Sequence, residues 1–159
     1  MKSVHMLALL ASAAAAAPSR VLQPAEIPQS LAQIEAQFNP APVPKWTVES
    51  LKRTCAADDS SCTWHFFIDN HVASKATEIT YVVEGPGASR AKSGPSEFGN
   101  YTITSSWSDQ FGADKGFTAL SAIDRKAGLI SFPAYRDVDV KEGKVVADKD
   151  FDVYYLDSK

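Results

Sequence analysis

The stretch CTWHFFID, residues 62–69, carries a large apolar side chain at every second position: Trp64, Phe66 and Ile68. Successive side chains of a β-strand point to opposite faces, so this period of two predicts a strand with one buried face. The same period recurs downstream in Ile79/Tyr81/Val83, Tyr101/Ile103/Trp107 and Phe117/Ala119/Ile123. Gly, Pro, Ser and Asp clusters bound each of these runs, as is typical of turns between strands.

We expect strands over 46–54, 62–69, 76–84, 99–108, 117–124, 128–134 and 151–156, and, from a weaker pattern, over 144–147. No helical run of ten residues separates them, which favours an all-β fold: a single-domain antiparallel β-sandwich or barrel. Residues 124–128 are expected to form a hairpin loop that ends at Gly128. Residues 85–99, rich in Gly and Pro, are expected to be the longest loop.

Cys55 and Cys62 flank a polar turn, AADDSS, between the first two expected strands. An even pair of cysteines in an exported chain is expected to be oxidised, so we predict a disulfide that links these strands. Closing a loop of about eight residues stabilises the fold by about 2.5 kcal/mol. A redox or zinc role is disfavoured because the spacing is not CxxC and two cysteines cannot complete a tetrahedral site.

Residues 1–17 have the pattern of a secretory signal peptide. Lys2 precedes an uncharged Leu/Ala-rich run from Met6 to Ala17, which is shorter than the about 20 residues that span a bilayer. Small residues of the A-x-A type precede Pro18, which favours cleavage near Ala17. We therefore expect a secreted, extracellular protein that is released without membrane insertion.

Residues 18–45 differ in composition from the rest, because six of the nine prolines lie there. We expect a Pro-rich arm or propeptide, with Ser30 capping a short helix that carries Leu31, Ile34 and Phe38 on one face. The segment could be cleaved, act as a tether or dock on the domain, and the flexible arm is favoured because so short a helix is marginal in water. The β-domain is expected over 46–159.

The net charge of this 159-residue chain is −3, with sixteen Lys and Arg against nineteen Asp and Glu. A protein that binds nucleic acid through its phosphates needs a basic surface, so we expect no nucleic-acid partner.

The residues give little indication of catalysis. His65, Asp69 and His71 form the one set that suggests a metal or acid–base site, but His71 lies beyond the expected strand end, and a surface histidine pair is the favoured interpretation. We predict no catalytic residues, no metal site and no cofactor, hence no enzyme. A small secreted hydrolase of the ribonuclease type is an alternative, although it would need cationic phosphate ligands as well as the histidines.

Two further motifs fail their tests. Asp148, Asp150 and Asp152 resemble the start of a calcium loop, but Val153 and Lys159 stand where such a loop needs Gly and Glu, so a solvated strand face is expected. The glycine-rich run 85–90 lacks the Gly-Lys pair and the following helix of a phosphate-binding loop.

Asn100-Tyr101-Thr102 is an N-glycosylation sequon beside the long loop. Most aromatic side chains are expected in the core: Trp46, Trp64, Trp107, Phe66, Phe111, Phe117 and Phe132. Phe111 is the least constrained by the alternation, so it, or the loop at Tyr135, is the candidate for contact with a partner.

Several short motifs recur in order between residues 46 and 147: LKRTC (51–55), DSSCTW (59–64), YVV (81–83), YTITS (101–105), WS (107–108), QFG (110–112), GFT (116–118) and PAY (133–135). In these the chain resembles fungal small secreted proteins described as hypersensitive-response-inducing elicitors. The resemblance implies a compact β-structure secreted by an ascomycete, in a family where some members trigger cell death or defence in plants and no enzymatic activity is implied. A more distant likeness in kind is the mould-allergen β-barrel family.

The family pattern, as the resemblance implies it, has a second cysteine pair where this chain has Ile79 and Phe98. An apolar contact between these two side chains can largely replace the bond, because burying a large side chain contributes roughly 1.5–3 kcal/mol. We therefore expect Ile79 and Phe98 to be neighbours.

Taken with the resemblance, these features predict a secreted, non-enzymatic effector or elicitor that acts by surface recognition of an unknown plant or cell-wall partner. A structural protein of the cell wall is the other alternative, and it would stay in the wall fraction.

Overall fold

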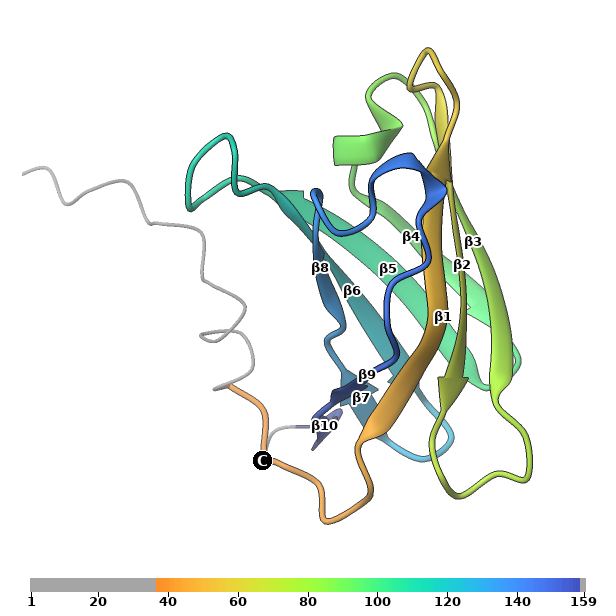
Figure 1. Ribbon diagram of the computed structural model, residues 1–159. Helices are drawn as coiled ribbons and strands as arrows, with labels where there is room; N and C mark the ends of the chain where they lie inside the picture. The colour runs from red at the N-terminus through yellow and green to blue at the C-terminus, as the bar shows by residue number, and fades with distance from the viewer. Residues whose placement is uncertain (1–36, 158–159) are drawn as a thin grey trace, which may run out of the picture.

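The computed structural model describes residues 37–157, which form an all-β domain of two antiparallel sheets (Figure 1). The elements are β1 (Trp46–Cys55), β2 (Ser61–Asp69), β3 (Thr77–Glu84), η1 (Ala88–Arg90), β4 (Ser93–Phe98), β5 (Tyr101–Ser108), β6 (Phe117–Asp124), β7 (Leu129–Ser131), β8 (Ala134–Arg136), η2 (Lys141–Gly143), β9 (Lys149–Phe151) and β10 (Val153–Tyr155). The predicted fold class is confirmed. The expected signal peptide, 1–17, lies outside the described residues.

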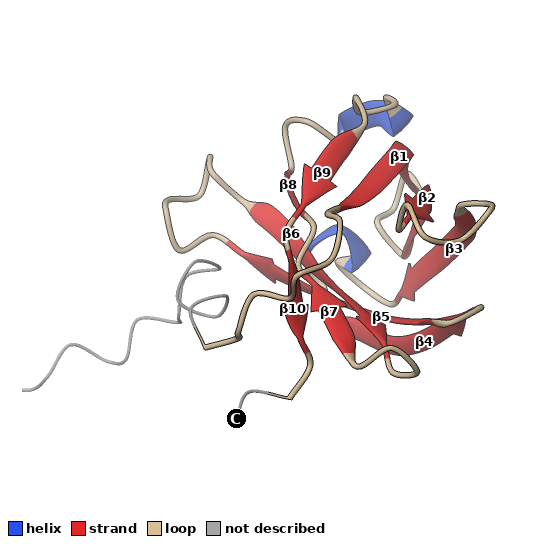
Figure 2. Cartoon of the chain, turned by 90° about the horizontal axis from the view of Figure 1, so that it is seen from below, coloured by secondary structure: helices blue, strands red, loops and turns tan. Residues whose placement is uncertain are grey.

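The smaller sheet has four strands in the order β3-β2-β1-β9, and the larger has six, in the order β10-β7-β6-β5-β4 with β8 also paired to β6. Consecutive strands β9 and β10 belong to different sheets and are separated by Asp152 alone. The chain thus passes from one sheet to the other within one residue, and the sheets face each other across the core (Figure 2).

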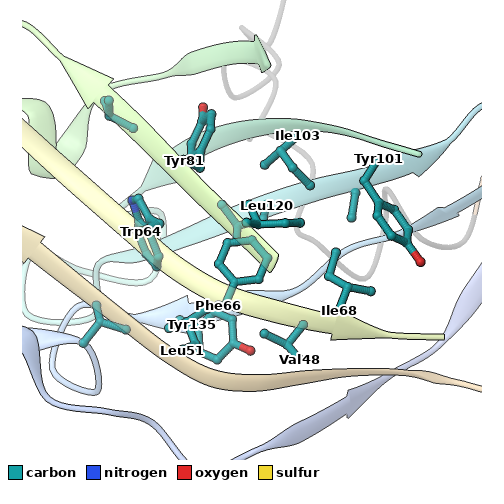
Figure 3. Close-up of a cluster of buried hydrophobic side chains, with 14 of the residues drawn as sticks. Val48, Leu51, Trp64, Phe66, Ile68, Tyr81, Tyr101, Ile103, Leu120 and Tyr135 are labelled. Carbon is teal, nitrogen blue, oxygen red and sulfur yellow. The ribbon is translucent and has the colours of Figure 1, made fainter. Parts of the chain in front are cut away.

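The core lies between the sheets and is made by alternate residues of the long strands (Figure 3). On β2 and β3 the buried positions are those the alternation predicts: Trp64, Phe66, Ile68, Ile79, Tyr81 and Val83. Tyr81 keeps its hydroxyl satisfied inside the core through a 2.9 Å hydrogen bond with Ser105 Oγ of the facing sheet. Burial of these side chains is the main source of stability.

The predicted buried face of β6 is wrong. The sequence pattern placed Phe117, Ala119 and Ile123 inside, but these residues are partly exposed, and Thr118, Leu120 and Ala122 are buried instead. Apolar residues occupy both faces of this strand, so alternation alone could not choose between them.

Several predicted element bounds also differ. The strand expected over 128–134 is two strands, β7 and β8, with Pro133 between them, where its carbonyl accepts a hydrogen bond from the Leu120 amide. The expected loop 85–99 contains η1 and β4. Proline has no backbone N–H to donate to a neighbouring strand, and β4 accommodates Pro95 because it lies at the edge of its sheet. The strand expected over 151–156 is divided at Asp152, and 144–147 is not a strand.

The described part of the arm, residues 37–45, packs against the domain. The Phe38 ring lies 5.2 Å from the Phe132 ring, and Pro40 forms a bridge with Tyr154 of β10. The Tyr155 amide donates to the Asn39 carbonyl. Residues 37–45 are therefore docked, whereas the short helix and the prolines favoured a flexible arm over 18–45, of which residues 18–36 lie outside the described part. Leu31 and Ile34 lie outside the described residues.

Ile79 is buried in β3 on the same face as Tyr81, and the Phe98 ring packs edge-to-face on Tyr81 at 6.4 Å. Phe98 of β4 thus reaches the core beside β3. The direct contact between Ile79 and Phe98 stays a prediction.

Candidate functional site

The disulfide between Cys55 and Cys62 is present, and the two residues are directly paired at the end of the β1–β2 hairpin. This confirms the predicted covalent link between the first two strands. The hairpin tip that follows Cys55 lies at one end of the domain, together with η1, the β5–β6 loop and the segment that contains η2 (upper end in Figure 1).

Asp59 joins the hairpin tip to η1. Its Oδ1 and Oδ2 accept 2.8 Å hydrogen bonds from the Ser89 amide and the Ser89 hydroxyl, and its carbonyl accepts from the Ala88 amide at 2.9 Å. Asp59 has a φ of 55°, in the left-handed region, which Asp tolerates better than most residues. Both carboxylate oxygens are thus engaged within the protein.

Arg53 lies buried behind this tip, with 7% of its surface exposed. Its Nη1 donates to Asp137 Oδ1 at 3.2 Å and to the Ser89 carbonyl at 3.3 Å, and its guanidinium carbon lies 5.2 Å from the centre of the Trp64 ring. A buried guanidinium needs such partners, because removal of a charge from water is costly unless it is paired.

Arg53 faces inward because β1 contains a bulge. The register with β2 shifts between Glu49 and Lys52, and Ser50, with a φ of 52°, donates its amide to Asp148 Oδ1. The shift moves the inward positions from Trp46 and Val48 to Leu51 and Arg53. Sequence reasoning missed this residue. The available signal was an arginine two positions after Leu51 in an alternating strand.

Asp137 connects this group to the larger sheet. Its Oδ2 accepts a 2.8 Å hydrogen bond from Trp107 Nε1 of β5, and the Arg90 guanidinium lies over the Trp107 ring at 5.1 Å. Gly116 allows the close approach, since a Cβ there would lie 2.5 Å from Asp137 Oδ2 and 3.0 Å from the Trp107 ring. Arg53, Asp137 and Trp107 therefore bridge the two sheets.

A pocket of about 480 Å³ opens beside the disulfide, between the hairpin tip and η2. Its lining includes Arg53, Cys55, Ala56, Asp59, Ser89, Val140, Lys141 and Glu142. Buried Val140 supplies an apolar wall, whereas Lys141 and Glu142 lie exposed at the rim. This combination of an apolar wall and a few fixed polar groups is typical of small-molecule sites.

Phe111 is 58% exposed in the β5–β6 loop and stacks on Phe117 at 5.9 Å. Phe111 is therefore not in the core, where most aromatic side chains were expected. It is available for contact with a partner, the other role for which it was a candidate. Tyr135 is not available: it is 4% exposed in β8 and packs against Phe151. Burial raises the pKa of the Tyr135 hydroxyl above its ordinary range.

Of the set His65, Asp69 and His71, the structure brings Asp69 and His71 into contact, and His65 pairs elsewhere. His65 Nε2 lies 2.9 Å from Glu78 of the neighbouring strand. His71 Nδ1 lies 3.2 Å from Asp69, and its Nε2 lies 2.7 Å from Thr47 Oγ1.

The Asp69–His71–Thr47 chain has the connectivity of a catalytic triad, but not its chemistry. Thr47 donates its hydroxyl proton to Asp150 Oδ1 at 2.7 Å, so His71 is not the acceptor of that proton. A general base has to accept the proton of the nucleophile it activates. The arrangement instead ties the start of β1 to the loop after β2 and to β9.

The three aspartates of the calcium-like motif have separate partners. Asp148 accepts from the Ser50 amide, Asp150 from Thr47, and Asp152 pairs with Lys45 at 3.0 Å. They lie exposed, as expected of a solvated face. Among the described residues, Cys55, Asp59 and Cys62 come close enough to suggest a metal site, but both sulfurs are consumed by the disulfide.

Comparison with known proteins finds relatives of the β-domain that contains the Arg53–Asp137–Trp107 bridge and the pocket. A family model described as Effector TSP1 matches residues 47–157. The chain belongs to the Effector TSP1 family. A relative from the fungus Hypocrea virens, named Effector TSP1, is 53% identical over 108 residues, which cover 67% of this chain and 73% of the relative. The family match spans every residue of the Arg53–Asp137–Trp107 bridge and of the pocket.

The relative agrees with the resemblance to fungal proteins in two respects, because it comes from a fungus and is named as an effector. Within residues 37–157 no helix has the length and apolar character needed to cross a bilayer.

Proposed function

We propose that the protein is a secreted, non-enzymatic effector that is recognised at plant surfaces and triggers cell death or defence there. The observation that carries the proposal is the match to the Effector TSP1 family over residues 47–157, together with the 53% identical effector of Hypocrea virens.

Export is the part of this proposal that rests on the chain itself. The segment 1–17 has the pattern of a signal peptide, and the Cys55–Cys62 disulfide is typical of proteins that mature in an oxidising compartment. Expression of the full chain in a fungal host tests it. We expect the protein in the medium, with an N-terminus near Pro18, whereas retention in the wall fraction would favour a structural wall protein.

Surface recognition is supported by the end of the domain that holds Phe111. A large exposed aromatic side chain on a loop is a frequent anchor in protein interfaces. Phe111 stacks on Phe117, which holds its exposed ring in place at the surface.

Leaf infiltration of the purified secreted protein tests the function. We expect cell death or induction of defence genes with native protein, and none with heat-denatured protein. The Phe111→Ala variant should lose most of the response, while Val138→Ala, a second exposed apolar residue at 54% exposure, should retain it.

The hydrolase alternative is tested in the same assay. The His65→Ala/His71→Ala double variant should retain full activity, because a non-enzymatic effector needs no base and both histidines are engaged in surface contacts with Glu78 and with Asp69 and Thr47. Loss of activity in a correctly folded double variant would favour the hydrolase.

N-glycosylation at Asn100 is part of the proposal. Asn100 is exposed in the two-residue turn between β4 and β5, where an oligosaccharide has room. Enzymatic deglycosylation should increase the mobility of the secreted protein, and Thr102→Ala should abolish this change. Unchanged mobility would show that the site is empty.

A further inference from the structure

We propose that the pocket beside the disulfide binds a small organic carboxylate through Arg53. The inference goes beyond the effector role and does not depend on it, because it rests on the chemistry of the pocket alone.

Arg53 supplies fixed donors at the pocket wall. Both of its hydrogen bonds within the described residues leave from Nη1, so the Nε–H and Nη2–H groups are available to a ligand. Arg53 lines the pocket, and its small exposed surface opens there. Adjacent donors on a planar guanidinium match the two oxygens of a carboxylate.

The guanidinium is held in place before any ligand arrives. Asp137, the Ser89 carbonyl and the Trp64 ring contact it from the protein side. A ligand therefore need not immobilise a long flexible side chain, which is a large part of the entropic cost when a surface arginine binds an anion.

Charged side chains around the pocket have opposing effects on the affinity for a carboxylate. Lys141 adds a positive charge beside the pocket, whereas Asp59 adds a negative charge that its hydrogen bonds from the neutral Ser89 do not cancel. Glu142 is a second opposing charge, and it is exposed. Glu142 should therefore weaken binding of an anion.

The rest of the pocket favours an apolar ligand body. Val140, Ala56 and the Cys55 side chain form its wall, and the volume of about 480 Å³ lies in the range of small-molecule sites, roughly 300–1,000 Å³. A single ring that bears a carboxylate fits this description.

The backbone at the edges of the pocket is also unusual. Asp59 and Glu142 have φ values of 55° and 62°, in the left-handed region. A glutamate in this region is uncommon, and such residues cluster at functional sites. Two of them border the same pocket, from the hairpin tip and from η2.

The test is a titration of the ¹⁵N-labelled secreted protein with benzoate, followed by amide shifts. We expect saturable shifts confined to Ala56, Ser89 and Gly143, and none with benzamide or inorganic phosphate at the same concentration. An equal response to benzamide would overturn the carboxylate assignment, and a response to phosphate alone would overturn the organic ligand. Absence of saturable shifts with benzoate would overturn the site.

Three variants distinguish the role of Arg53 in ligand binding from its role in the stability of the fold. Arg53→Lys keeps the charge but loses the planar donors, so the dissociation constant should rise by about tenfold or more. Glu142→Gln should bind benzoate more tightly than the wild type. Because Arg53→Lys could disturb the core, Ala56→Phe serves as a second test: it fills the pocket and should abolish binding while the other amide signals remain in place.

Arg125→Lys, in the β6–β7 turn at the opposite end (Figure 1), is the matched control and should bind as the wild type does. Unchanged benzoate affinity in both Arg53→Lys and Ala56→Phe would refute the proposal.

Discussion

Arg53 of β1 and Asp137, which follows β8, form an ion pair of 3.2 Å that joins the two sheets at the end opposite the β9–β10 crossing. Their side chains are 7% and 23% exposed. Because the other oxygen of Asp137 accepts from Trp107 Nε1, the pair is part of a bridge across the domain. The same arginine forms a wall of the pocket, so stability and the proposed ligand site share one residue.

Removal of Asp137 should destabilise the protein more than removal of a surface carboxylate. Asp137→Ala leaves the Arg53 charge buried without its partner and the Trp107 N–H without its acceptor. We expect the free energy of unfolding to fall by about 3 kcal/mol, measured by urea denaturation. The control is Asp139→Ala, which breaks an exposed pair with Arg136 and should have little effect. Equal effects of the two variants would contradict the structural role of Asp137.

Loss of the disulfide should weaken the domain without abolishing its fold. The Cys55→Ser/Cys62→Ser variant should lose about 2.5 kcal/mol of stability, because the bond closes a short loop in a domain with its own core. Circular dichroism during urea unfolding measures the change. Titration of free thiols in the unreduced wild type should find none, and two reactive thiols would contradict the bond.

The two faces of β6 can be distinguished by a pair of truncations. Leu120→Ala removes a side chain that is 1% exposed and should cost about 2–5 kcal/mol, whereas Ile123→Ala, on the partly exposed face, should cost clearly less. Thermal or urea unfolding of both variants provides the comparison. A larger loss for Ile123→Ala would reverse the assigned orientation of the strand.

The contact predicted between Ile79 and Phe98 can be tested by placing a cysteine at each of these positions. The Ile79→Cys/Phe98→Cys variant should form a second disulfide on secretion, because Phe98 packs on Tyr81, beside Ile79 on the same strand face. Mass spectrometry of the alkylated, unreduced protein detects the bond. Two alkylated thiols in this variant would show that the side chains are not neighbours.

Alkaline pH should destabilise the protein through Tyr101. Burial raises the pKa of its hydroxyl from the ordinary value of 10 to about 12. The folded state thus retains this proton after the unfolded state has lost it, so its contribution to stability is full below pH 10 and is lost as pH rises towards 12. Absorbance of tyrosinate, followed with unfolding, measures this effect. Tyr101→Phe should remove part of the loss between these pH values.

Local sequence was sufficient to predict the features that depend on only a few neighbouring residues. Alternation along β2 and β3 predicted both the strands and their buried faces, since side-chain direction in a strand follows position in the chain. The disulfide was predictable because Cys55 and Cys62 flank one turn.

Tertiary structure decided the rest. The face of β6 depends on which sheet covers it, and both of its faces carry apolar residues. Arg53 turns inward through a bulge and meets Asp137 from 84 residues away, a pairing that no local pattern records. The chain alone thus set most strands, the buried faces of β2 and β3 and the covalent link between β1 and β2. Long-range packing chose the buried face of β6, turned Arg53 inward and assembled the pocket, because burial of charge and of apolar surface is settled only when distant segments meet.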